Sequence, residues 1–199
     1  MCGITGFVSR SVPDQQALKA MANMIRHRGP DDEGFFVDEH CAIAHRRLSI
    51  IDLANGHQPM VSQDGKLVLA YNGEVYNYQQ LREELISAGR TFLTNSDTEV
   101  ILQGYAQFGP EFTKRLRGMF TFVIWDKEKQ ELYGARDPFG IKPFYYAQMG
   151  DTFFFGSELK SFLPHPHFKK ELNNEALKFY LPFQYSALDE SFLKGVFRL

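Results

Sequence analysis

The hydrophobic residues of this chain occur mostly in short runs, and turn-forming residues separate these runs. Apolar runs of this length are typical of strands, whereas apolar residues three and four apart are typical of helices. The runs predict strands at about 3–8, 34–38, 42–47, 66–72, 118–125, 131–136, 143–148 and 152–156. Helical spacing predicts helices over 14–25, from Asn77 to about Gly89, and from Ser96 to about Phe108.

Local signals indicate where several of these elements begin and end. Ser96 and Glu99 have the spacing of a capping box, and Asn77 with Gln80 resembles one. Asn72 and Gly73 form a turn signal, which predicts that the strand over 66–72 ends there.

Strands and helices are grouped along the chain and do not alternate. This order favours an α+β fold with mostly antiparallel sheets over a doubly wound parallel sheet. The pattern changes after the run from His165 to His167, which we expect in an exposed linker. We therefore predict one domain over residues 1–165, followed over 166–199 by a linker and the start of a second, truncated domain.

Composition restricts the class of protein. The sequence has 199 residues, of which 44% are hydrophobic, and a formal net charge of −2 at pH 7. This charge gives no reason to expect nucleic acid or an anionic membrane surface as a partner. No apolar stretch reaches the roughly 18 residues of a membrane helix, and the first residues lack the features of a signal peptide. With only two cysteines, Cys2 and Cys41, a cytoplasmic protein is predicted.

Cys2 is the strongest candidate for chemistry. It follows Met1 directly, so removal of Met1 would give one residue both a thiol and a free α-amine. An α-amine has an ordinary pKa of about 7.7–8.0, so part of it is neutral near pH 7 and can accept the proton of a thiol. Nucleophile and base would then belong to one residue. The strand-like run that follows argues against a frayed terminus, and Cys41 is expected in the core.

Seven motifs follow one another in the sequence: Cys2-Gly-Ile-Thr-Gly6, Arg28-Gly-Pro-Asp31, His45-Arg-Arg-Leu-Ser-Ile-Ile-Asp52, Gly56-His-Gln-Pro59, Tyr71-Asn-Gly-Glu-Val-Tyr-Asn77, Ser96-Asp97-Thr98-Glu99 and Arg136-Asp-Pro-Phe-Gly-Ile-Lys-Pro143. Each motif is weak alone. In this order they resemble the class II glutamine amidotransferases, and the asparagine synthetase type most closely. The resemblance covers roughly residues 2–163.

This resemblance implies a glutaminase domain of the N-terminal-nucleophile hydrolase type, built as a four-layer αββα sandwich of two mostly antiparallel sheets. Its substrate would be glutamine, and hydrolysis would need no cofactor and no metal. The ammonia would pass to a C-terminal synthetase domain of the same polypeptide. That domain would bind ATP and Mg²⁺, and its Ser-Gly-Gly-x-Asp-Ser phosphate loop does not occur in this sequence. A homodimer is compatible with the resemblance.

The oxyanion that forms during amide hydrolysis needs preorganised hydrogen-bond donors. Asn72 and Gly73 can supply a side-chain amide and an unhindered backbone N–H, and the resemblance assigns the oxyanion hole to this pair. On local sequence alone a simple turn would be preferred. The presence of Cys2 in the chain, and of Glu74 directly after Gly73, favours the oxyanion hole over the turn.

The resemblance also implies a binding site for the charged end of glutamine. Arg47 would hold the α-carboxylate, because a guanidinium fits a carboxylate with two bonds. Its neighbour Arg46 would point to the opposite face as a solvated surface charge. Glu74 and Asp97 would bind the α-ammonium, and Asp97 would also suit the start of a helix. Backbone groups of the following residues would complete the pocket: Leu48, Ile50 and Ile51.

Two alternatives stay open. The domain could feed another amidation, with an aminosugar, a purine precursor or another carboxylate as acceptor. It could instead be a non-catalytic module that binds glutamine, although Cys2, Arg47, Asn72 and Asp97 favour an enzyme.

Overall fold

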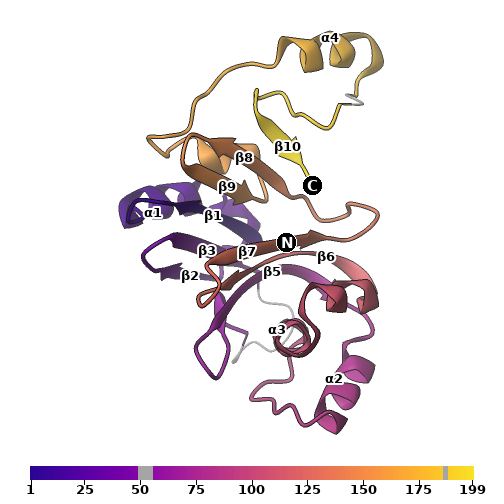
Figure 1. Ribbon diagram of the computed structural model, residues 1–199. Helices are drawn as coiled ribbons and strands as arrows, with labels where there is room; N and C mark the ends of the chain where they lie inside the picture. Colours follow the sequence, from indigo (N-terminus) through magenta and orange to yellow (C-terminus); the bar gives the residue numbers. More distant parts are fainter. Residues whose placement is uncertain (49–55, 186–187) are drawn as a thin grey trace.

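The computed structural model describes residues 1–48, 56–185 and 188–199, and its strands form two antiparallel sheets that lie face to face (Figure 1). Within these ranges the first sheet has six strands, in the order β10 (Val196–Arg198), β8 (Tyr145–Met149), β9 (Thr152–Gly156), β1 (Gly3–Ser9), β3 (Cys41–Arg47) and β2 (Asp32–Val37). The second sheet, over the same ranges, has four strands: β4 (Met60–Val61), β5 (Leu67–Val75), β6 (Gly118–Asp126) and β7 (Glu131–Arg136).

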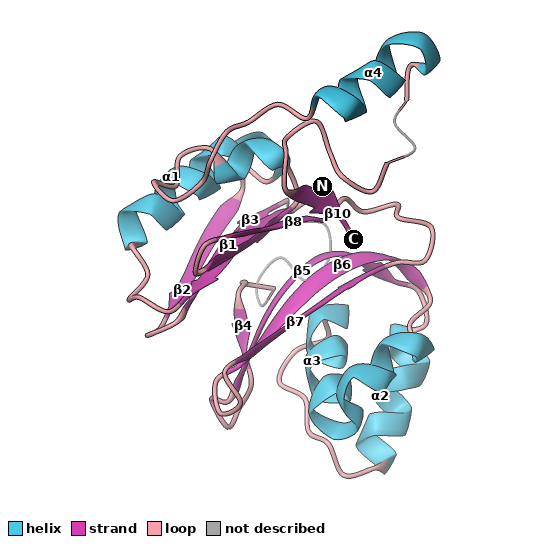
Figure 2. Cartoon of the chain, turned by 45° about the horizontal axis from the view of Figure 1, so that its top comes forward, coloured by secondary structure: helices cyan, strands magenta, loops and turns pink. Residues whose placement is uncertain are grey.

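Helices cover the outer faces of both sheets (Figure 2). Helix α1 (Gln15–Met24) lies on the first sheet, and α2 (Tyr78–Ser87) and α3 (Asp97–Phe108) lie on the second. This confirms the expected αββα sandwich. Short 3₁₀ segments connect the layers: η1 (Arg26–Arg28), η2 (Gly109–Arg115) and η3 (Leu159–Phe162).

The alternation of side chains along each strand produces the layers. On β3, Ile43 packs between the sheets, whereas Ala44 packs under α1. On β5, Ala70 faces the first sheet, whereas Leu69 and Tyr71 face α2 and α3. Each fully buried aliphatic side chain contributes about 1.5–3 kcal/mol. A strand with both faces buried is therefore held firmly in register.

Strand β5 is longer than its sequence predicts. The expected turn at Asn72 and Gly73 is wrong, because both residues lie inside the strand and pair with Thr121 and Phe120 of β6. A Cβ on Gly73 would lie 2.3 Å from the Met119 carbonyl oxygen, so glycine is required here for close strand packing. Gly73 therefore serves strand packing, and the dipeptide does not reverse the chain.

The predicted helix caps are formed in part. Ser96 caps α3 by accepting the N–H of Glu99, as the capping box requires. In a full capping box the Glu99 side chain would bond the N–H of Ser96. Here the Glu99 carboxylate accepts the N–H groups of Leu93 and Thr94 instead. Asn77 precedes α2 but does not cap it, since its side chain bonds the backbone of 115 and 117.

The segment after residue 165 lies partly in the first sheet. Strand β10 pairs antiparallel with β8, while helix α4 (Asn174–Phe183) stands away from the sandwich (Figure 2). The predicted division at residue 165 stays a prediction. The expectation of an exposed linker is wrong for His165, which is buried between Phe7 and Phe154.

In the described part of the chain, helices long and apolar enough to cross a membrane are absent.

Candidate active site

The start of β1, the end of β3 and the last part of β5 meet where the two sheets face each other. One set of alternating side chains on each strand points into this space, including Ile4 of β1, Ile43 of β3 and Ala70 of β5. Because side chains alternate along a strand, Cys2, Arg47 and Asn72 point to the same side as these core residues. Gly3 lies opposite Arg46 in the antiparallel ladder, so Cys2 comes beside the end of β3.

A cavity of about 110 Å³ opens at this place. Its lining contains every predicted site residue that the structure describes: Cys2, Arg47, Leu48, Asn72, Gly73, Glu74 and Asp97. Ile50 and Ile51 lie outside the described residues. A wider hollow of about 970 Å³ lies beside the turn between β8 and β9, but the described residues that line it include no cysteine. The chemistry therefore favours the smaller cavity.

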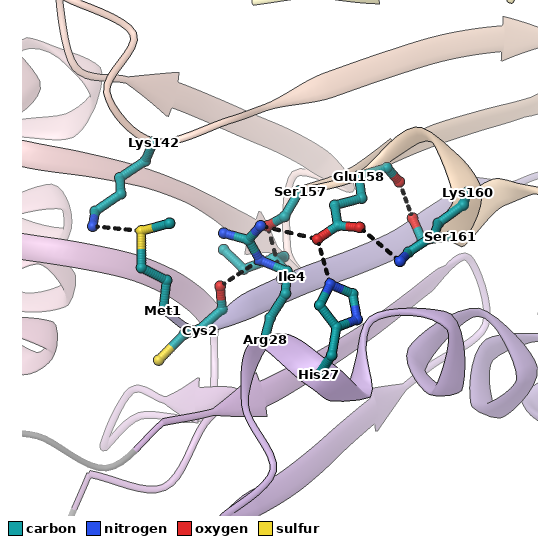
Figure 3. Close-up of polar contacts among 10 residues, drawn as sticks. All are labelled: Met1, Cys2, Ile4, His27, Arg28, Lys142, Ser157, Glu158, Lys160 and Ser161. Atoms are coloured by element: carbon teal, nitrogen blue, oxygen red, sulfur yellow. Dashed lines mark hydrogen bonds and ion pairs between the residues drawn. The ribbon is translucent and has the colours of Figure 1, made fainter.

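The thiol of Cys2 is half-buried and contacts the backbone of Leu48 twice. Its Sγ lies 3.6 Å from the Leu48 carbonyl oxygen and 3.4 Å from the Leu48 nitrogen. The Cys2 carbonyl oxygen accepts a 3.0 Å bond from Arg28 Nε. Figure 3 shows the sulfur turned away from Arg28. The main chain of Cys2 is thus held on one side and the thiol is directed to the other.

A network of charges fixes Arg28 in turn (Figure 3). Its Nη1 lies 3.0 Å from Glu158 Oε1, which also lies 2.8 Å from His27 Nε2, while Lys160 Nζ lies 3.1 Å from Glu158 Oε2. Burial alone would raise the pKa of Glu158, but the hydrogen bonds from Arg28, His27 and Lys160 lower it overall. Glu158 therefore stays an anion and orients the guanidinium that holds Cys2.

Asn72 and Gly73 present donors to the cavity. Asn72 is 2% exposed, and its Nδ2 has no hydrogen-bond partner among the described residues. Phe120, opposite Gly73, bonds Asp137 through both its N–H and its carbonyl. Gly73 and Phe120 therefore form a non-hydrogen-bonded pair, and the Gly73 N–H points away from β6. A buried amide donor without a partner is costly unless a ligand satisfies it.

Charged side chains of both signs line the cavity beside Cys2. Arg47 and Asp97 are each 7% exposed, whereas Glu74 is exposed. Asp97 Oδ2 accepts bonds from Tyr71 Oη at 2.6 Å and from the Val75 N–H at 3.0 Å. Burial raises the pKa of Asp97 although these hydrogen bonds oppose the change. A cation in the cavity would stabilise the charged form of this carboxylate.

Arg46 points to the opposite face from Arg47, as the alternation predicts. The expectation that it is solvated is wrong, because it is 7% exposed and holds the end of α1. Its Nε donates to the Ala22 carbonyl oxygen and its Nη2 to Asn23 Oδ1, and it forms an ion pair with Glu33. Burial under α1 makes Arg46 a structural cation.

Sequence reasoning missed several lining residues: Met1, Gly56, Gln58, Tyr71, Ser96, Thr98, Met119 and Lys142. The motif Gly56-His-Gln-Pro59 was one available signal, and it carried no assigned role. Lys142 lies 3.2 Å from the Met1 sulfur (Figure 3). Over the described ranges no group of three or more His, Cys, Asp or Glu side chains could hold a metal ion.

Comparisons with known proteins agree with this geometry. A family model for the glutamine amidotransferase domain matches residues 1–199. The chain is 47% identical over 190 residues to asparagine synthetase (glutamine-hydrolyzing) 1 of Bacillus subtilis strain 168, an alignment that covers 93% of this chain and 30% of that protein. It is 43% identical over 183 residues to asparagine synthetase (glutamine-hydrolyzing) 2 of the same strain, covering 89% of this chain and 24% of that protein.

A solved structure supports the fold. The chain is similar to the glutamine phosphoribosylpyrophosphate amidotransferase of B. subtilis complexed with ADP and GMP, with a TM-score of 0.71 and 26% sequence identity. The match covers 86% of this chain and 45% of that one. The chain thus spans less than a third of the length of the two curated relatives named above.

Proposed function

This chain belongs to the glutamine amidotransferase domain family, and we propose that it hydrolyses glutamine to glutamate and ammonia with Cys2 as the nucleophile. The observation that carries this proposal is the unpartnered, buried Nδ2 of Asn72 in the cavity that also holds the Cys2 thiol. It is a donor placed where an oxyanion would form.

Glutamine would enter with its charged end between the ionic groups of the cavity. Arg47 would bind the α-carboxylate, and Asp97 with Glu74 would bind the α-ammonium. Backbone groups of Leu48 support the opposite side, since they already contact the thiol. Ile50 and Ile51 are proposed as further binding residues. This orientation carries the side-chain amide toward Cys2.

The first half of the reaction forms a thioester. The free α-amine of Cys2 takes the thiol proton, and the sulfur attacks the amide carbon of glutamine. The negative oxygen that results is held by Asn72 Nδ2 and the Gly73 N–H. The C–N bond then breaks, the ammonium of Cys2 returns its proton to the leaving nitrogen, and ammonia departs.

The second half hydrolyses the thioester. The same amine removes a proton from water, which attacks the thioester carbon and forms a second oxyanion in the same hole. The C–S bond breaks, glutamate leaves, and the thiol regains its proton. The α-amine exists only after Met1 is removed, because in the longer chain this nitrogen belongs to a peptide bond.

We further propose that a synthetase domain of the same polypeptide receives the ammonia, with aspartate as its acceptor and with ATP and Mg²⁺ bound only there. The asparagine synthetases that this chain matches support this assignment, and they extend far beyond the matched region. On α4 and after it, large apolar side chains are exposed and could pack against such a domain: Phe179, Leu181, Phe183 and Tyr185. A cytoplasmic location and a homodimer remain proposals.

A glutaminase assay on the chain tests the proposed function. Wild-type protein should release glutamate and ammonia, and Cys2→Ala should abolish both. Cys41→Ala is the matched control, because Cys41 is buried between the sheets and burial raises the pKa of its thiol well above the usual range. Glutamine binding without hydrolysis by the wild type would favour the non-catalytic module instead.

A further inference from the structure

Among the described residues, no strand pairs with the edge of β5 beyond Leu69 that faces away from β6, and side chains bond this edge instead. Strand β4 pairs only with the first part of β5, through Val61 with Val68 and Met60 with Leu69. Beyond Leu69, β5 continues to Val75 with β6 on one side. The Val75 N–H on the open side is taken by Asp97. Tyr71 directly precedes Asn72. Its backbone N–H and carbonyl also point away from β6, and each forms a hydrogen bond with a side chain.

His45 binds the carbonyl group of Tyr71. Its Nε2 lies 2.9 Å from the Tyr71 oxygen, and because a carbonyl can only accept, Nε2 carries the proton. His45 is 1% exposed, and Nδ1 has no hydrogen-bond partner among the described residues. Burial lowers the pKa of His45 to about 4, so the ring is neutral near pH 7 and keeps this tautomer.

Gln58 binds the N–H group of Tyr71. Its Oε1 accepts this bond at 2.6 Å, and Gln58 is 6% exposed. The backbone of Gln58 rests on β2, where a Cβ on Gly34 would lie 1.9 Å from the Gln58 carbonyl oxygen. Neighbouring His57 bonds Asp32 on the same strand at 2.8 Å. Gln58 therefore extends from the first sheet to the second.

We infer that His45 and Gln58 are positioning residues that clamp the Tyr71 peptide groups and thereby aim the Asn72 amide and the Gly73 N–H into the cavity. Both clamps connect the sheet that carries Cys2 to the strand that carries the donors, so they fix the distance between nucleophile and oxyanion hole. The inference rests on the proposed glutaminase function. It gives a role to the motif Gly56-His-Gln-Pro59 and to the histidine of the motif that begins at His45.

Removal of one clamp should act on the transition state. Gln58→Met keeps the length of the side chain but removes the acceptor, whereas Gln58→Glu keeps an acceptor oxygen. We expect Gln58→Met to lower kcat about tenfold or more, because misdirected oxyanion donors stabilise the transition state less, while KM changes less than about twofold. Gln58→Glu should retain more of the activity. His45→Phe against His45→Gln gives the same comparison for the carbonyl clamp.

A matched control separates positioning from general loss of packing. Trp125 Nε1 donates a 2.6 Å bond to Asp38 Oδ2, which also links the two sheets but lies away from the cavity. Trp125→Phe should lower the melting temperature and leave kcat unchanged. Melting temperatures of all variants identify any that fail to fold, and His45→Gln and Gln58→Glu keep the test available if the stronger changes unfold.

A double-mutant cycle of Gln58→Met with Asn72→Ala tests whether Gln58 acts through the oxyanion donors. If Gln58 acts through the oxyanion donors, the penalty of Gln58→Met should shrink when Asn72 is already alanine. The same full penalty in both backgrounds, or a rise in KM with kcat unchanged, would overturn the inference. Failure of the wild type to hydrolyse glutamine would instead contradict the proposed function. The two failures are thus distinguishable.

Discussion

At the residue scale, the cavity combines a thiol, an unpartnered amide donor and ionic groups of both signs. Gly73 adds a geometric feature. Its lack of a side chain admits the close approach of β6, and its N–H points away from β6. Arg47 and Asn72 come from two different strands and Cys2 directly precedes a third, and the alternation of side chains makes them face one another.

Arg47→Lys should weaken glutamine use while the fold stays intact. Lysine keeps the charge but loses the planar fork that binds a carboxylate with two bonds. A charged hydrogen bond contributes about 1.5–3 kcal/mol, so kcat/KM should fall roughly ten- to hundredfold. Steady-state kinetics measure this change, and the melting temperature without substrate serves as the control. Unchanged kinetics would mean that another cation holds the α-carboxylate.

Asn72→Asp should lower kcat far more than it changes glutamine binding. The variant keeps the size of the side chain but presents an acceptor to a negative intermediate, and removal of one oxyanion donor costs about 2.7–4 kcal/mol. Because the oxyanion exists only along the reaction path, glutamine should still raise the melting temperature. Loss of that protection with turnover preserved at saturation would assign Asn72 to substrate binding.

At the element scale, tertiary contacts changed what local sequence signals predict. Apolar periodicity predicted the approximate position and type of the longer strands and of α1, α2 and α3, but the short strands β4 and β10 were not predicted. The turn signal at Asn72 and Gly73 failed because pairing with β6 continues through both residues. The Asn77 cap failed because its side chain bonds the backbone of Arg115, at the end of η2, and of Arg117, which follows it. Local sequence patterns therefore predict which elements form, whereas contacts between residues far apart in the sequence determine where those elements end.

Gly104→Ala should destabilise the chain although alanine favours a helix. Gly104 lies inside α3, where alanine would normally gain about 1 kcal/mol over glycine. Here a Cβ would lie 2.0 Å from the ring of Phe112, which is 2% exposed. Overpacking costs typically about 1–3 kcal/mol, so it should outweigh the gain. Thermal unfolding measures the result, and a raised melting temperature would show that Phe112 can move aside.

In the whole molecule, the site depends on how two sheets pack together. The sequence predicts that the sheets form, but it does not give their strand register or their contacts with each other. The resemblance supplied the layer order and the set of site residues. It did not supply the buried state of Arg46, the clamps on Tyr71 or the network behind Cys2, because each joins residues far apart in the sequence. Such contacts depend on sheet register, which no local pattern contains.

Acid should destabilise the fold through its buried histidines. Burial lowers the pKa values of His45 and His165 from the usual 6.5 to about 4. The unfolded chain therefore takes up protons below about pH 6.5 while the folded chain does not, so stability is lost as pH falls from 6.5 toward 4. Each histidine accounts for up to about 3 kcal/mol.

The variant His165→Phe isolates one of these contributions and lies outside the cavity. Chemical unfolding at pH 7 and at pH 5 should show a smaller loss of stability for this variant than for the wild type. An equal loss in both proteins would mean that His165 titrates normally in the folded state.

In the proposed reaction Cys2 forms the thioester, with its own α-amine as the base. The most direct measurement is mass spectrometry of the N-terminal peptide after the reaction with glutamine is quenched in acid. We expect a glutamyl group on Cys2 in chains that lack Met1, and none on Cys2 in chains that retain it. A glutamyl group on another residue would contradict the assignment of Cys2 as the nucleophile, and full turnover by chains that keep Met1 would contradict the role of its α-amine.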